Sequence, residues 1–172
     1  MTALPTWPHD ARLHAWWVTP ALLAGEYPGD PDRDAAREKV GLLAEAGVST
    51  IVDLTTPRDH LRPYEGLLPD TITRSEFPIP DRGVIDDAGY DDIVAHIRAE
   101  IGSGGRVYVH CWGGVGRTST VIACVLGADG LSHDQALERI AEARAGTRKG
   151  HRRFLESGPQ RELVARRLAT TA

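Results

Sequence analysis

The sequence has few cysteines, few aromatic residues and no long apolar run, and each shortage excludes a class of protein. Two cysteines in 172 residues do not make a disulfide framework, so we expect a reducing compartment and predict a cytoplasmic location. No stretch reaches the roughly 18 consecutive apolar residues of a membrane-spanning helix. The N-terminus lacks the basic region and apolar segment of a signal peptide. We therefore expect no membrane partner.

The chain also lacks a basic excess. Its formal net charge of −4 argues against a general nucleic-acid or membrane-surface binder. The hydrophobic content of 41% and charged content of 26% are ordinary for a globular protein. We predict one domain over residues 1–172, with residues 1–12, which contain Pro5 and Pro8, as an arm.

Residues 106–126 hold the most informative pattern. Residues 106–110 alternate polar and apolar side chains, which predicts a short buried strand. The glycines at 113, 114 and 116 then predict a loop, and the apolar run 118–126 predicts a buried helix. The order is strand, glycine-rich loop, helix, with Cys111 at the end of the strand and Arg117 at the start of the helix.

This order predicts an anion site. Glycines let backbone N–H groups turn inward, and a helix N-terminus adds unpaired donors and a positive dipole end. The guanidinium of Arg117 matches two phosphate oxygens, and Cys111 lies beneath them as a thiolate nucleophile. The residues that we expect to bind phosphate are Trp112, Gly113, Gly114, Val115, Gly116 and Arg117.

The run His110-Cys111-x-x-Gly114-x-x-Arg117-Thr118 resembles the HCxxGxxR[ST] signature (a CX5R motif) of the cysteine-dependent protein tyrosine and dual-specificity phosphatases. One departure is Gly113, where many members carry Ala; we expect it to loosen the loop without removing a donor. The resemblance implies an α/β fold with a mainly parallel, twisted sheet of four to five strands and helices on both sides. It also implies a phosphomonoesterase with a phosphocysteine intermediate, in which Thr118 donates a hydrogen bond to the sulfur.

Such an enzyme needs neither a metal nor a cofactor, because Arg117 and the loop amides supply the charge stabilisation. It does need a proton donor for the leaving oxygen. Asp81 lies 30 residues before Cys111 in Phe77-Pro-Ile-Pro-Asp81, with Gly83 as a bend, and this segment resembles the general-acid loop of dual-specificity phosphatases. Asp86 and Asp87 are alternatives that suit the cap of a following helix better.

Four more residues are candidates near the site. His110 is expected to hold the cysteine loop rather than to react. Arg58 and Tyr64 follow the predicted strand 48–54 at the end where ligands bind in α/β sheets; a solvated Arg and a packed Tyr are equally open readings. Gln160 falls where related phosphatases often carry a Gln near the site, although an exposed first-turn position fits it better.

The remaining pattern outlines the other elements. We predict an edge hairpin from residues 16–18 and 22–25, a helix that Asp30 caps and that ends near Ala46, a strand at 71–77, a helix at 88–101, a capping box at 132–135 and a last helix from Pro159. The basic stretch 144–153 is either a solvated face or a contact for an acidic partner or phosphorylated substrate. Cys124 is expected in the core.

The substrate class follows from the loop. None of the side chains between Cys111 and Arg117 is basic, which favours a phosphorylated protein over the alternative of a phosphoinositide or inositol phosphate. Trp112 is either a pocket wall or a packing residue behind the loop. A non-catalytic phosphate-binding module is the alternative outside this class. A sulfurtransferase or arsenate reductase would need a resolving cysteine, for which Cys124 is badly placed.

Overall fold

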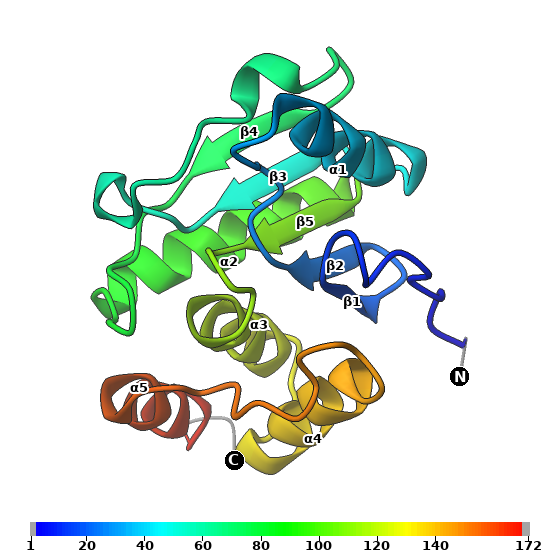
Figure 1. The fold of residues 1–172 in the computed structure, drawn as a ribbon. Helices are drawn as coiled ribbons and strands as arrows, with labels where there is room; N and C mark the ends of the chain where they lie inside the picture. Colours follow the sequence, from blue (N-terminus) through cyan, green and yellow to red (C-terminus); the bar gives the residue numbers. More distant parts are fainter. Residues whose placement is uncertain (1–2, 170–172) are drawn as a thin grey trace.

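A five-stranded sheet forms the centre of the protein in the computed structural model, which describes residues 3–169 (Figure 1). The strand order is β1-β2-β5-β3-β4. Only the outermost pair, β1 and β2, is antiparallel, and every other pair is parallel. The predicted sheet and its edge hairpin are therefore confirmed. The strands are β1 (Ala15–Thr19), β2 (Leu22–Gly25), β3 (Thr50–Asp53), β4 (Thr73–Glu76) and β5 (Val107–His110).

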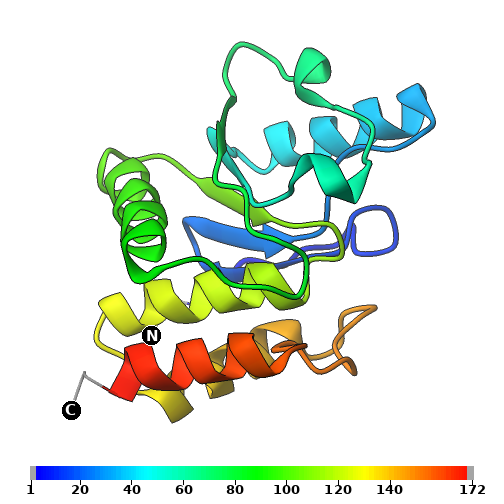
Figure 2. The same ribbon diagram turned by 90° about the vertical axis from the view of Figure 1, so that its left-hand side faces the viewer.

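Helices cover both faces of the sheet, but unevenly. One face carries α1 (Arg33–Glu45), and the other carries α2 (Asp87–Gly102), α3 (Gly116–Ala128), α4 (His133–Arg144) and α5 (Gly158–Ala169). Helix α3 packs against α2, α4 and α5 and is buried from residue 116 to 127; Figure 2 shows it between the sheet and α5. No helix in the described part is long and apolar enough to cross a membrane.

The alternation of side chains along the strands builds two cores. Ile51 and Tyr108 point into the core shared with α1, whereas their neighbours Val52 and Val109 point into the core shared with α2 to α5. Successive residues of a strand face opposite sides of a sheet, and both of these central strands are buried on both faces. This is the burial expected of parallel strands covered by helices.

The register of the parallel strands brings their carboxyl ends to one edge. Gly25 pairs with His110, His110 with Asp53, and Asp53 with Glu76. Each of these residues ends its strand, so the four loops that follow β2, β3, β4 and β5 leave the sheet side by side. Ligands of open α/β sheets bind at this edge.

Helix ends were predicted well in two cases and wrongly in one. Asp86 caps α2, and Ser132 and Gln135 form the capping box of α4. Asp30 does not cap α1, however: Asp32 does, by accepting from the N–H groups of Asp34 and Ala35. The carboxylate of Asp30 accepts instead from the N–H of Asp32 at 2.9 Å, so it shapes the turn before the helix.

The N-terminal segment packs on the body of the protein. The indole N–H of Trp7 donates to the carbonyl of Leu13 at 2.8 Å, and Asp10 contacts the ring of His14 at 2.7 Å. Asp10 also accepts from the backbone N–H of Arg148, far along the chain. Residues 1 and 2 of the predicted arm lie outside the described residues.

Candidate active site

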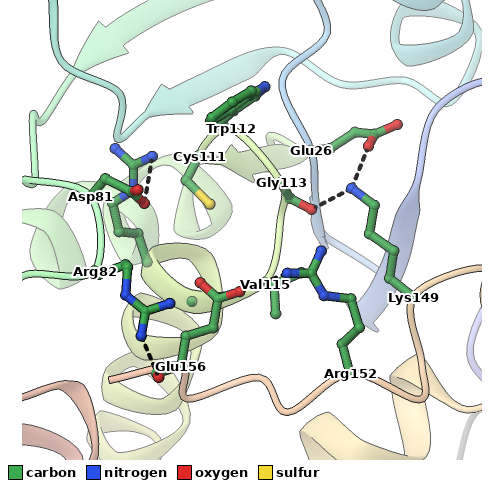
Figure 3. A pocket seen from close by; sticks show the side chains of 12 residues that line it. Glu26, Asp81, Arg82, Cys111, Trp112, Gly113, Val115, Lys149, Arg152 and Glu156 are labelled. Atoms are coloured by element: carbon green, nitrogen blue, oxygen red, sulfur yellow. Dashed lines mark hydrogen bonds and ion pairs between the residues drawn. The ribbon is translucent and has the colours of Figure 1, made fainter. Parts of the chain in front are cut away.

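A cavity of about 380 Å³ lies at the edge where the strand loops meet the segment that joins α4 to α5 (Figure 3). The cysteine loop forms its floor, and charged side chains from three other segments surround it. Its lining comprises Glu26, Asp81, Arg82, Cys111, Trp112, Gly113, Val115, Gly116, Arg117, Lys149, Arg152 and Glu156.

The sulfur of Cys111 lies at the N-terminus of the central helix. Cys111 follows directly on β5, and α3 begins five residues later at Gly116. In the first turn of α3, the hydroxyl of Thr118 lies 3.1 Å from the sulfur and donates to it. A helix N-terminus and a hydroxyl donor therefore both lie at the sulfur.

The loop from Cys111 to Arg117 presents backbone donors. The N–H groups of residues 112–115 donate to no other group within residues 3–169, and the first turn of α3 leaves more N–H groups unpaired. Gly114 has a φ of +70°, and a Cβ there would lie 2.4 Å from the carbonyl carbon of Gly25. The loop therefore needs glycine at 114 to curve inward while resting on the end of β2.

Arg117 is buried and held by the carboxylate of Asp59, which was not predicted as a site residue. Both oxygens of Asp59 accept from its guanidinium at 2.9 Å, and the carbonyl of Ile79 accepts at 3.0 Å. Burial opposes both charges, yet the pair raises the pKa of Arg117 and lowers that of Asp59. The Nε of Arg117 is buried with no hydrogen-bond partner among residues 3–169, which leaves this donor for a ligand oxygen.

Asp81 reaches the same guanidinium from the loop after β4. Its Oδ1 lies 3.4 Å from Nη2 of Arg117, although 56% of its side chain is exposed. A tight turn places it there: the N–H of Gly83 donates to the carbonyl of Pro80. The alternatives are occupied elsewhere, because Asp86 caps α2 and Asp87 pairs with Arg166.

His110 connects the loop to the α1 side of the sheet. Its Nδ1 lies 2.9 Å from the carbonyl of Cys111, which only accepts, so Nδ1 carries a proton. Burial lowers the pKa of His110, so the ring is neutral and its Nε2 accepts from the hydroxyl of Tyr64 at 2.6 Å. Burial also raises the pKa of Tyr64, which keeps it a donor. His110 thus holds the loop from behind.

Three candidates of the sequence analysis lie away from the cavity. Tyr64 is packed behind the loop on His110, and Arg58 is exposed on a short 3-10 turn and does not line the cavity. Gln160 is neither exposed nor at the rim: it is buried against Gly116, and its side-chain oxygen accepts from the N–H of Glu156. Trp112, by contrast, is 57% exposed and forms a wall of the cavity.

Six charged residues at the site were not predicted as site residues. Asp59 had a signal, since a buried arginine needs a carboxylate and Asp59 lies in the loop after β3. Lys149 and Arg152 belong to the basic stretch, which the fold turns partly toward the cavity. The others, Glu26, Arg82 and Glu156, carry no local pattern that marks them.

The family model of the Swiss Army Knife protein DSP-PTPase phosphatase domain (PTP-SAK) matches residues 14–164. Among curated proteins, the chain is 31% identical over 75 residues to cyclin-dependent kinase inhibitor 3 of Rattus norvegicus, an alignment that covers 42% of this chain and 35% of the relative. The chain therefore matches about a third of the length of that protein.

Solved structures share the fold. Kinase associated phosphatase (KAP) superposes with a TM-score of 0.74 at 21% identity, covering 88% of this chain and 92% of that one. Tk-PTP in its active form gives 0.70 at 22%, covering 95% and 99%, and TpbA of P. aeruginosa gives 0.69 at 20%, covering 99% and 96%.

Two neighbouring glycines of the loop should tolerate alanine very differently. At Gly114 the left-handed backbone alone costs an alanine about 1–2 kcal/mol, and its methyl group would collide with the backbone of Gly25. At Gly113 φ is not positive, and the nearest atom to a Cβ is the Lys149 Nζ at 3.9 Å. We expect Gly114→Ala to lower both the melting temperature and phosphate binding, and Gly113→Ala to keep both. Equal losses in the two variants would contradict this loop geometry.

The buried, neutral His110 should make the protein less stable in mild acid. Its pKa in the folded protein lies below the ordinary value of 6.5. As the pH falls through that value, the unfolded chain therefore binds a proton that the folded protein does not yet take, and the free energy of unfolding decreases. The measurement is denaturant unfolding between pH 8 and pH 5. His110→Gln should reduce the slope; it would not vanish, because burial also lowers the pKa of His14.

Proposed function

Since the chain belongs to the DSP-PTPase phosphatase domain family of the Swiss Army Knife proteins, we propose that it hydrolyses phosphate monoesters through a phosphocysteine intermediate. The observation that carries the proposal is the position of Cys111, beneath unpaired loop amides and beside a buried arginine that keeps one free donor. No metal or cofactor takes part in the proposed reaction. The thiol must stay reduced, and we propose a reducing compartment such as the cytoplasm.

The first step transfers the phosphoryl group to sulfur. The amides of residues 112–117 and the guanidinium of Arg117 bind the non-bridging oxygens of the phosphate. The Cys111 thiolate attacks phosphorus in line, so that an S–P bond forms and the P–O bond to the leaving group breaks. Asp81, as a carboxylic acid, gives its proton to the leaving oxygen. A phosphate that displaces the Asp81 contact from Arg117 would free this carboxyl for that oxygen.

The second step returns the thiolate. Asp81, now a carboxylate, accepts a proton from water while the water oxygen bonds to phosphorus and the S–P bond breaks. Thr118 donates to the departing sulfur and stabilises its negative charge. Inorganic phosphate then leaves. Asp59 takes no direct part, but it fixes the plane of the Arg117 guanidinium throughout.

We propose a phosphorylated protein as the substrate. The cavity has three cations besides Arg117, but Lys149 pairs with Glu26 at 2.7 Å and Arg152 with Glu156 at 3.1 Å. Outside the loop from Cys111 to Arg117 the lining is therefore close to electrically balanced, which suits a single phosphate better than several. An inositol phosphate, which these cations could bind in place of their carboxylate partners, is the second candidate. A panel of phosphopeptides and inositol phosphates, compared by kcat/KM, separates the two.

Hydrolysis of p-nitrophenyl phosphate in the presence of EDTA tests the reaction. We expect Cys111→Ser to abolish activity, because a hydroxyl does not ionise in this site. Asp81→Asn should slow turnover about 10²–10⁴-fold, the usual contribution of a general acid. Each has a matched control. Cys124→Ser alters the other free cysteine, whose burial raises its pKa to about 11, and Asp86→Asn keeps a good helix cap.

Both controls should retain wild-type rates. Activity that survives in Cys111→Ser would show that the sulfur is not the nucleophile. Loss of activity in Asp86→Asn together with retention in Asp81→Asn would show that Asp86, and not Asp81, is the general acid. A folded wild-type protein that binds phosphate without turnover would favour the phosphate-binding module instead.

A further inference from the structure

The inward-facing N–H groups of the cysteine loop set a requirement for the carbonyls on its outer side. A trans peptide group is planar, and its C=O and N–H point in opposite directions. Each loop N–H that faces a phosphate therefore sends the preceding carbonyl outward, and a buried carbonyl needs a donor there. In this loop the N–H groups of residues 112, 113 and 114 depend on the carbonyls of residues 111, 112 and 113.

Each of these three carbonyls has a donor from a different part of the chain. His110 donates to the carbonyl of Cys111 at 2.9 Å, and the backbone N–H of Tyr27 donates to that of Trp112 at 2.9 Å. The carbonyl of Gly113 accepts from the Lys149 ammonium at 2.8 Å. Two of the donors are fixed by the sheet, since His110 is the last residue of β5 and Tyr27 follows β2. The third is the end of a long, flexible side chain.

The third peptide is also the one with the most freedom to turn over. It joins Gly113 to Gly114, so both dihedral angles that rotate it belong to glycines, which have no Cβ to restrict them. No regular element holds it, because α3 begins only at Gly116. An outward carbonyl at this position therefore depends on the hydrogen bond from Lys149 more than its two neighbours depend on theirs.

Lys149 is itself held at two points: Glu26 binds its ammonium, as Figure 3 shows, and Arg144 binds its backbone carbonyl. Its ammonium donates to Oε2 of Glu26 at 2.7 Å, and the other oxygen of Glu26 accepts from the N–H of His14 at 2.8 Å. Burial opposes the charge of Glu26, but these donors lower its pKa, so it remains a carboxylate. From inside, the buried guanidinium of Arg144 donates to the carbonyl of Lys149 at 2.9 Å.

We propose that Lys149, anchored by Glu26, is a positioning residue that keeps the N–H of Gly114 directed at the bound phosphate. The inference rests on the proposed phosphatase function, and it places a determinant of phosphate affinity outside the cysteine motif. A simpler role for Lys149, long-range attraction of the phosphate dianion, makes the opposite prediction for Glu26. Removal of a nearby negative charge would strengthen such attraction, whereas loss of the anchor would weaken a positioned donor.

The experiment measures the inhibition constant of inorganic phosphate and kcat/KM for p-nitrophenyl phosphate at one ionic strength. Glu26→Gln and Lys149→Met should each raise the inhibition constant and lower kcat/KM about tenfold, the effect of one charge-assisted hydrogen bond. Lys149→Arg should recover part of the loss. Arg148→Met is the matched control, because Arg148 also binds Glu26, at 2.7 Å, but lies outside the cavity lining. It should stay within about twofold of wild type.

The outcomes separate this inference from the function on which it rests. A lower inhibition constant in Glu26→Gln would show that Lys149 acts through its charge alone, and would overturn the positioning role. An inhibition constant and a kcat/KM of Lys149→Met that match those of Arg148→Met would overturn the positioning role as well. If Lys149→Met yields little folded protein, the direction in which Glu26→Gln changes the inhibition constant still decides between positioning and long-range attraction. A folded wild type that neither hydrolyses the ester nor is bound by phosphate would overturn the proposed function, and the positioning role with it.

Discussion

The site depends on one constraint: a short loop must point several consecutive N–H groups inward while its carbonyls find donors outside. A helix pairs these groups within its own backbone and a strand pairs them with adjacent strands, so a loop that leaves them free needs its neighbours to hold its shape. Here β5 delivers the loop between β2 and β3, and Gly114 rests on the last residue of β2. The parallel register is thus a condition of the anion site as much as a feature of the fold.

At the same edge of the sheet, the loops after β2, β3 and β4 each supply one carboxylate to the site. Glu26 follows β2 and anchors Lys149, Asp59 follows β3 and orients Arg117, and Asp81 follows β4 and faces the phosphate position. Their surroundings separate their roles. The side chain of Asp59 is almost fully buried and accepts hydrogen bonds from both Arg117 and Thr56, whereas Asp81 is largely exposed and has one long contact. The exposure of Asp81 suits the general-acid role proposed for it.

The sequence predicted what lies close together along the chain. Strand, loop and helix follow one another between residues 106 and 128, and the motif assigns Cys111 and Arg117 without reference to distant residues. Contacts across the sheet had no such signal. Arg58 was a candidate because it follows a strand at the ligand-binding end of the sheet, but its neighbour Asp59 is the residue that contacts Arg117, since a buried guanidinium requires a counter-ion. Arg144 and Glu26 both bind Lys149, and its ammonium reaches the carbonyl of Gly113 from there.

Detection of the phosphocysteine itself tests the central claim most directly. The protein would be mixed with p-nitrophenyl phosphate, quenched in acid within its turnover time, digested and examined by mass spectrometry, with Asp81→Asn used to slow breakdown of the intermediate. The account predicts that the peptide containing Cys111 gains the mass of one phosphoryl group, and that the peptide containing Cys124 does not. An active enzyme with no phosphoryl group on Cys111, or with one on another residue, would contradict it.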